Sequence, residues 1–219
     1  MKPRHPKKII EYLGIGGEDG LQGFTTSSGT GQSGANTLAT GSYHFFTGAN
    51  AIQLQQGTSS GTGKMQNNWR TVPPRGATRF RCIAVLRPGS NDSDWDTILL
   101  NVSHRTGSHI LTPALRLQSN KGTTEEYQYF NESDAWADTG LTWRSDASLT
   151  FTRVEFVYSI EESVYVSASI NGEQATAGGT ALSKSADGNG PRINAWISLT
   201  GETTTSYAFV DSFVMEAIG

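Results

Sequence analysis

The stretch "FVYSIEESVYVSASINGEQA", residues 156–175, contains two runs in which apolar and polar side chains alternate with a period of two. This is the period of a β-strand, because successive side chains of a strand point to opposite faces of its sheet. The first run begins just upstream, and one of its faces carries Val154, Phe156 and Tyr158. In the second run, the alternation assigns to one face Val164, Val166, Ala168 and Ile170.

Both runs end at residues that favour turns. Residues 160–163 join the two runs, and Asn171-Gly172 closes the second. Asn-Gly tolerates the positive φ angles that a type I′ turn requires at its central residues. The sequence therefore predicts an antiparallel meander with one face in solvent.

Similar short runs continue along the chain, and no segment keeps an apolar period of 3.6 residues over three turns. Strand character is found at 43–56, 77–89, 95–103, 113–119, 124–131, 193–200 and 207–217, whereas 25–42 is expected to be a surface loop or an irregular edge and 58–64 a loop. Sheets of many short strands hide their edges by stacking or closing. We therefore predict an all-β fold, a single two-sheet antiparallel β-sandwich of the jelly-roll type over residues 21–219, with an N-terminal arm at residues 1–20.

The charge distribution separates this arm from the body. Only 17% of the 219 residues are charged and the formal net charge is −3, yet four basic residues lie within the first eight positions. The body is thus more acidic than the whole chain, which argues against nucleic acid as its partner. The arm is either a solvated N-terminus or a segment that docks on an acidic neighbour through Lys2, Arg4, Lys7 and Lys8.

The sequence offers few groups for redox or metal chemistry. Cys82 is the single cysteine, so it has no disulfide partner within the chain, and its alternating run predicts a core position. The four histidines show no spacing typical of zinc ligands. No stretch has the apolar length of a signal peptide or a membrane span, so we expect a protein made in a cytoplasm and no membrane partner.

The order of the strand-like segments resembles the concanavalin A-like lectin and glucanase superfamily, especially its laminin-G-like modules. The resemblance covers roughly residues 43–218 and includes the hairpin closed by Asn171-Gly172 and the position of Asp211 in the last run. It implies a jelly-roll sandwich whose function lies in its loops and on its concave face. The superfamily hosts lectins, hydrolases, lyases, adhesion modules and viral coat components, so the resemblance leaves the activity open.

The segment "FNESDAWADTGLTW", residues 130–143, was compared with the catalytic strand of glycosidases in that superfamily, in which two carboxylates two residues apart act as nucleophile and acid. Glu132 and Asp134 have this spacing, but Asp138 comes four residues later and a turn is expected at Thr139-Gly140. The arginine-rich strand and the Gln-Ile-His box of the superfamily's alginate lyases are also missing. We therefore predict no catalytic residue.

The same segment is a candidate glycan contact. The ring of Trp136 offers an apolar surface to a sugar, and Asn131, Asp134 and Asp138 offer hydrogen bonds to hydroxyl groups. The alternative is that Trp136 packs on the core while the acids face water. The remaining tryptophans are expected to pack in the core or at its rim rather than to form a stacking platform for a ligand: Trp69, Trp95, Trp143 and Trp196.

A weak calcium site is considered at Asp92, Asp94 and Asp96, since carboxylates are the oxygen ligands that calcium prefers. Thr97 and Ser103 stand where an EF-hand loop needs its glycine and its glutamate, so that type of loop is excluded. A solvated turn is the alternative, and no other cofactor is predicted.

Three functions remain open from the sequence. The first is a structural or adhesion protein of a bacteriophage particle, such as a head decoration, fibre or tail component, in contact with other virion proteins as a homo-oligomer or lattice. The second is a lectin module that binds cell-surface or environmental glycans, on a virion or outside the cell. The third is a polysaccharide-degrading enzyme.

Overall fold

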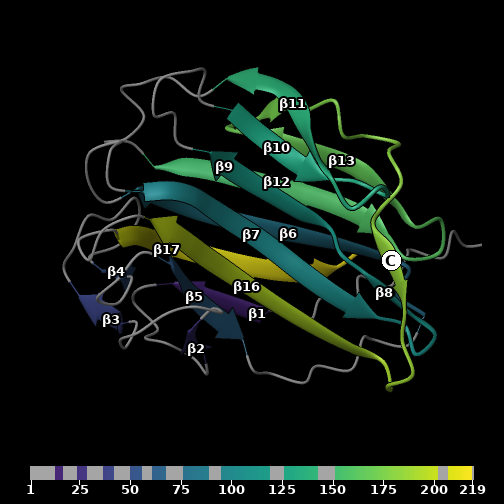
Figure 1. Cartoon of the computed structure of the whole chain (residues 1–219), viewed down its shortest axis with the longest axis horizontal. Coiled ribbons are helices and arrows are strands. Elements are labelled where there is room, and N and C mark those ends of the chain that lie inside the picture. The colour runs from purple at the N-terminus through teal and green to yellow at the C-terminus, as the bar shows by residue number, and fades with distance from the viewer. Residues whose placement is uncertain are drawn as a thin grey trace, which may run out of the picture.

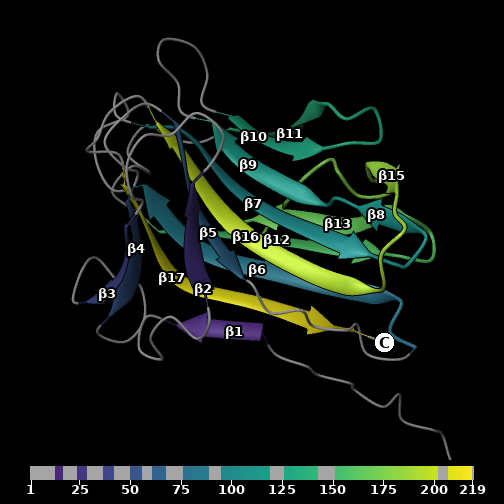
Figure 2. The same cartoon turned by 60° about the horizontal axis from the view of Figure 1, so that its bottom comes forward.

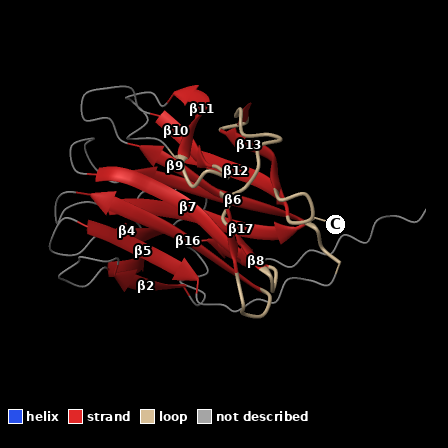
Figure 3. Ribbon diagram, turned by 45° about the vertical axis from the view of Figure 1, so that its right-hand side comes forward, coloured by secondary structure: helices blue, strands red, loops and turns tan. Residues whose placement is uncertain are grey.

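The structure is a computed structural model that describes residues 13–16, 24–28, 37–41, 50–55, 61–67, 76–88, 95–118, 126–142, 151–201 and 207–218. Its strands are β1 (Leu13–Gly16), β2 (Phe24–Ser28), β3 (Thr37–Gly41), β4 (Ala51–Gln55), β5 (Gly61–Asn67), β6 (Arg79–Pro88), β7 (Trp95–Arg105), β8 (His109–Leu111), β9 (Ala114–Gln118), β10 (Glu126–Phe130), β11 (Trp136–Thr142), β12 (Thr152–Ser159), β13 (Val164–Ile170), β14 (Glu173–Gln174), β15 (Lys184–Ala186), β16 (Arg192–Gly201) and β17 (Tyr207–Ala217). Strands and their connections make up all of this part of the chain (Figure 3), and it contains no helix able to span a membrane.

The strands form two antiparallel sheets that stack face to face. Sheet A has the order β14-β13-β12-β6-β17-β4-β3, with β1 also paired to β17, and sheet B has the order β11-β10-β9-β7-β16-β5-β2, with β8 joining β7 to β15. In Figure 1 sheet B lies in front, and Figure 2 shows the two layers from below. The predicted all-β, two-sheet antiparallel sandwich is confirmed. Strand β17 lies in the centre of sheet A, between β6 and β4.

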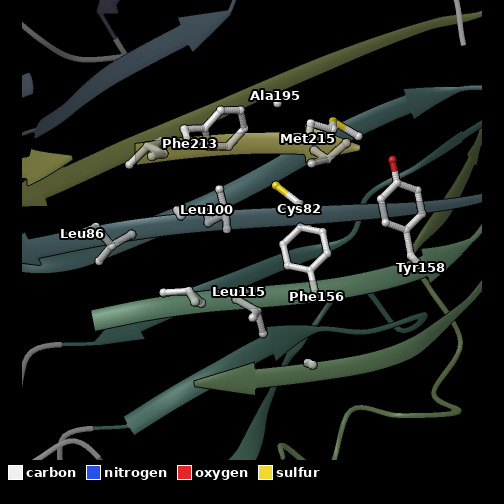
Figure 4. Close-up of a cluster of buried hydrophobic side chains, with 14 of the residues drawn as sticks. Cys82, Leu86, Leu100, Leu115, Phe156, Tyr158, Ala195, Phe213 and Met215 are labelled. Atoms are coloured by element: carbon white, nitrogen blue, oxygen red, sulfur yellow. The ribbon is translucent and has the colours of Figure 1, made fainter. Parts of the chain in front are cut away.

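The core fills the space between the two sheets. Alternate residues of β6 and β12 point into it, and Cys82 and Phe156 are fully buried there beside Leu115 of sheet B (Figure 4). Burial also raises the pKa of the Cys82 thiol, so this cysteine stays protonated and unreactive. The predicted core position of Cys82 is confirmed.

The hairpin of residues 152–174 follows the prediction in its turns but not in all of its faces. Asn171 and Gly172 both have positive φ, 51° and 89°, as a type I′ turn requires. The β12–β13 register shifts between Val157 and Tyr158, which marks a β-bulge. Beyond the bulge Tyr165 is fully buried and Val166 is 37% exposed, so the predicted inward face of Val166 is wrong.

Two further expectations are corrected. Residues 58–64 were expected to form a loop, but Gly61–Asn67 is strand β5, paired to β16 on one side and β2 on the other. A turn was expected at Thr139-Gly140, but both residues lie within strand β11. There the β10–β11 register shifts and Gly140 has a φ of 75°, so the irregularity is a bulge.

Residues 25–42, expected to be a loop or an irregular edge, include parts of the edge strands β2 and β3. The division into an arm at 1–20 and a sandwich at 21–219 stays a prediction. Strand β1 lies on the arm side of that boundary and pairs with β17 from Leu13↔Met215 to Gly16↔Ser212.

Candidate functional site

The face of sheet B that points away from sheet A carries polar and aromatic side chains. In β7, Leu100 and Val102 belong to the core, so Asn101 between them points outward. In β16, Ala195 and Ile197 belong to the core, so Trp196 points outward as well. We call this surface the outer face of sheet B, and no described strand lies over it.

A row of neighbouring residues crosses this face from strand to strand. Phe130 pairs with Trp136, Asn101 pairs with both Ala114 and Trp196, and the β9–β10 register places Phe130 next to Ala114. We call these five residues the aromatic row. Ala114 is fully covered and Asn101 is 9% exposed, whereas the aromatic residues on either side are half-buried. The row thus has a small polar centre between two aromatic sides.

The amide of Asn101 is the unusual group in this row. Its Oδ1 is buried and has no hydrogen-bond donor among the described residues. A buried acceptor without a donor costs about 1–3 kcal/mol. A ligand with hydroxyl groups would supply that donor, and aromatic rings on both sides would contact its apolar surface.

The predicted glycan contacts lie at one end of the aromatic row, and several of them hold the β10–β11 hairpin together. Asn131 Oδ1 accepts hydrogen bonds from Ser133 N (3.0 Å) and Ala135 N (3.2 Å). Asp138 Oδ1 accepts one from Gly140 N at 2.8 Å. Asp134, at a φ of 55°, accepts a hydrogen bond from Ser183 Oγ. The structure places all four predicted contacts in or beside this hairpin: Asn131, Asp134, Trp136 and Asp138. Their glycan role stays a prediction.

Trp136 is half-buried and packed on two sides. Its ring centroid lies 5.1 Å from that of Phe130, and the Arg116 guanidinium carbon lies 4.3 Å from the Trp136 centroid, a cation–π contact. Arg116 Nε also donates to Gln128 Oε1 at 2.7 Å. This packing fixes the Trp136 ring at the edge of the outer face.

Glu132 and Asp134, the pair compared with glycosidase carboxylates, lie in the exposed connection between β10 and β11. A glycosidase pair is held on one strand so that both groups face the scissile bond. The connection gives these two carboxyl groups no such shared strand, and the expectation that they are not catalytic stays a prediction.

A pocket of about 290 Å³ opens at the end of the sandwich near β8, where it is lined by Ser108, His109 and Glu161 among others. His109 Nδ1 lies 2.9 Å from Ser108 Oγ, a contact that a nucleophile and its base would make. The described residues place no carboxylate in hydrogen-bond contact with the other nitrogen of His109. The pair therefore lacks the third group that orients a catalytic histidine.

His104 is a second histidine whose role is internal. It is fully buried between the sheets, with Nδ1 2.9 Å from Tyr158 Oη and the Phe80 ring 4.5 Å away between centroids. Burial lowers its pKa to about 4. This histidine is neutral at neutral pH and belongs to the core.

The remaining candidates fall mostly outside the described residues. Six of them lie outside that part of the chain: Lys2, Arg4, Lys7, Lys8, Asp92 and Asp94. For Asp96, the structure describes only the backbone, which is part of β7. Among the residues it does describe, no group of three or more His, Cys, Asp or Glu side chains is arranged to hold a metal ion. The docking arm and the calcium site stay predictions.

No protein-family model matches the sequence, and no curated protein matches it either. Solved structures match its fold. A carbohydrate esterase of the Shiga toxin-encoding bacteriophage phi24B has a TM-score of 0.62 at 12% identity, over 96% of this chain and 100% of that one. The cellulose-induced protein Cip1 has a TM-score of 0.61 at 12% identity, over 93% and 96%. A CBM2 module of the evolved Dit of Lactobacillus casei BL23 phage J-1 has a TM-score of 0.51 at 10% identity, over 95% and 97%.

These matches, together with lectins among the solved structures, show that the chain has the concanavalin A-like lectin fold. The resemblance found in the sequence is thereby confirmed at the level of the fold. Sequence reasoning missed Asn101 and treated Trp196 as a core or rim residue. The alternation in "INAWISLT" contained the missing signal, since it places Trp196 on the face opposite Ala195 and Ile197.

Proposed function

We propose that this chain is a non-enzymatic, carbohydrate-binding adhesion module that uses the outer face of sheet B and is carried on a bacteriophage particle. The observation that carries the binding role is Asn101, a 9%-exposed amide whose Oδ1 has no donor, set between aromatic residues. Sugars combine hydroxyl donors with apolar ring faces, and this pairing matches both features of the aromatic row.

Three further observations support the proposal. The names of two structural matches refer to carbohydrates. One is a carbohydrate esterase, and the other is the carbohydrate recognition domain of the protein Emp46p. Two of the matching chains come from bacteriophages. The low charge content of the sequence fits a surface that stays soluble through hydroxyl and amide groups.

Replacing Trp196 by alanine is expected to weaken glycan binding at least about tenfold, because the variant removes one aromatic side of the row. The measurement is isothermal titration with a glycan selected by the wild type on a glycan array. Tyr207→Ala is the matched control, since Tyr207 is a half-buried aromatic residue on the outer face of sheet A. This variant should bind the selected glycan with the affinity of the wild type. A wild type that selects no glycan, or a Trp196→Ala variant with unchanged affinity, would contradict the proposed site.

Deleting residues 1–8, which removes Lys2, Arg4, Lys7 and Lys8 and leaves strand β1 in place, is expected to remove the protein from phage particles while leaving glycan affinity unchanged, because the basic arm is proposed to dock on the particle. Quantitative mass spectrometry of purified particles measures the first effect, and titration with the selected glycan measures the second. If the full-length chain is itself absent from particles, the virion part of the proposal is wrong.

A further inference from the structure

At one end of the outer face of sheet B, two arginines lie directly opposite each other. Arg105 ends β7, Arg192 begins β16, and the two residues are register partners. Their neighbours His104 and Ile193 are buried in the core, so both arginines point to the outer face. Like charges directly across a sheet are destabilising, so this pair calls for a compensating negative charge.

One carboxylate provides part of this compensation. Asp187 Oδ1 accepts a hydrogen bond from Arg105 Nη1 at 2.9 Å, and the Asp187 side chain is 2% exposed. Asn189 holds the same oxygen through its backbone and side-chain nitrogens at 3.1 and 3.0 Å. Burial acts to raise the pKa of Asp187, but these hydrogen bonds and the charges of Arg105 and Arg192 leave it below its ordinary value. The cluster therefore holds two positive charges and one negative charge.

The hydrogen bonds of the cluster are also incomplete. The Nε atoms of Arg105 and Arg192 are buried without an acceptor, and Asp187 Oδ2 is buried without a donor. On the outer face of sheet A, by contrast, Arg81 pairs with Glu155 at 2.8 Å, and Arg153 pairs with the same glutamate at 2.6 Å. A ligand that satisfies the sheet B cluster must bring both an anionic oxygen and a hydroxyl donor.

The cluster lies on the same two strands as the centre of the aromatic row. Arg105 and Arg192 are each four residues from Asn101 and Trp196, about 13 Å along the strands. Ser103 and Asn194 pair between them and point to the same face. A glycan chain lying along β7 and β16 would therefore contact the aromatic row and the arginines together.

We propose, building on the carbohydrate-binding role above, that the preferred glycan is acidic and that Arg105 and Arg192 bind its carboxylate or sulfate group while Asp187 accepts a hydrogen bond from a hydroxyl of the same sugar. Carboxylate and sulfate share the oxyanion chemistry that a pair of guanidinium groups recognises. Uronic acids and sulfated sugars are two sources of that group, and both also carry hydroxyl groups.

Arg192→Gln is the variant of choice, because Arg192 Nε is buried without an acceptor and removal of the Arg192 charge also relieves the like-charge pair. The full-length wild type and this variant are titrated with an acidic glycan selected on an array of uronate-containing and sulfated glycans, and with a neutral form of each (methyl-esterified or desulfated). The wild type should bind the acidic form at least about tenfold more tightly, and Arg192→Gln should lose that preference. Arg153→Gln, which removes a half-exposed arginine from sheet A, should keep it.

A second measurement keeps the two proposals separable. Sodium sulfate at constant ionic strength should raise the thermal midpoint of the wild type by about 2–4 °C more than that of Arg192→Gln. Equal binding of acidic and neutral glycans by the wild type, with binding still lost in Trp196→Ala, would overturn the acidic preference and leave the carbohydrate-binding role standing. A sulfate effect that depends on Arg192, without binding of any glycan, would support the anion site and overturn the carbohydrate-binding role. Equal sulfate effects in wild type and Arg192→Gln would overturn the anion site.

Discussion

Lowering the pH from 6.5 to 4 is expected to reduce the free energy of unfolding by about 3 kcal/mol through His104 alone. Burial lowers the pKa of His104 from 6.5 to about 4 in the folded protein. Between these two values the unfolded chain binds a proton that the folded chain refuses, so acid favours unfolding. Well below pH 4 both states are protonated and His104 causes no further loss. Urea unfolding at a series of pH values measures the effect.

Carboxylates also titrate in this range, so the histidine must be isolated by comparison. Glu155, for example, has a pKa below its ordinary value, because the ion pairs with Arg81 and Arg153 outweigh the effect of its burial. The variant His104→Asn keeps a polar group near the Tyr158 hydroxyl but removes the titrating ring. Between pH 6.5 and pH 4, the free energy of unfolding of His104→Asn should fall by about 3 kcal/mol less than that of the wild type. His109→Asn, which changes a partly exposed histidine, should follow the wild type, and an unchanged pH dependence in His104→Asn would refute the assignment.

Replacing Tyr165 by alanine is expected to lower the free energy of unfolding by about 4 kcal/mol or more, whereas Val166→Ala should cost less than about 1 kcal/mol. Tyr165 is fully buried and Val166 is the 37%-exposed residue of the bulge. The Tyr165 hydroxyl accepts a hydrogen bond from Ala114 N at 2.8 Å and lies 2.9 Å from the Phe130 carbonyl oxygen. The side chain therefore joins sheet A to the strands that carry the aromatic row.

Chemical denaturation of three variants makes this test specific. Tyr165→Phe keeps the ring but leaves Ala114 N without an acceptor, so it should cost about 1–3 kcal/mol, between the values of the other two variants. The reverse order, with Val166→Ala more costly than Tyr165→Ala, is the result that the plain alternation of the sequence predicts, and it would show that the bulge is misplaced.

The fold was predictable because most of its strands carry their own signal. In β6, β7, β12 and β16 the large apolar residues recur every second position, and this pattern alone separates the inner face from the outer face. The bulge in β13 could not be seen in this way, because a single extra residue exchanges the two faces without changing the composition. Strand β5 was missed because Gly61 and Gly63 give it the composition of a loop, while its pairing to β16 depends on backbone groups.

The candidate site was harder to predict because its residues come together through strand pairing. Asn101 and Trp196 are 95 positions apart, and only the β7–β16 register makes them neighbours. Register depends on which strands pair and on every bulge between them, and one sequence does not reveal either. The hairpin residues Asn131 and Trp136 could be named as candidates because they are close along the chain, which is the only kind of proximity that a sequence displays.

The central position of β17 has a consequence for how this protein is made. Among the described strands, the β12-β6 and β4-β3 parts of sheet A are joined by hydrogen bonds only through β17, the last described strand of the chain. Until residues 207–217 have left the ribosome, β6 and β4 each have an unpaired edge, and such edges invite association between nascent chains. Sheet A is therefore completed after synthesis of its final strand, through contacts between distant parts of the sequence, which is typical of slow-folding β proteins.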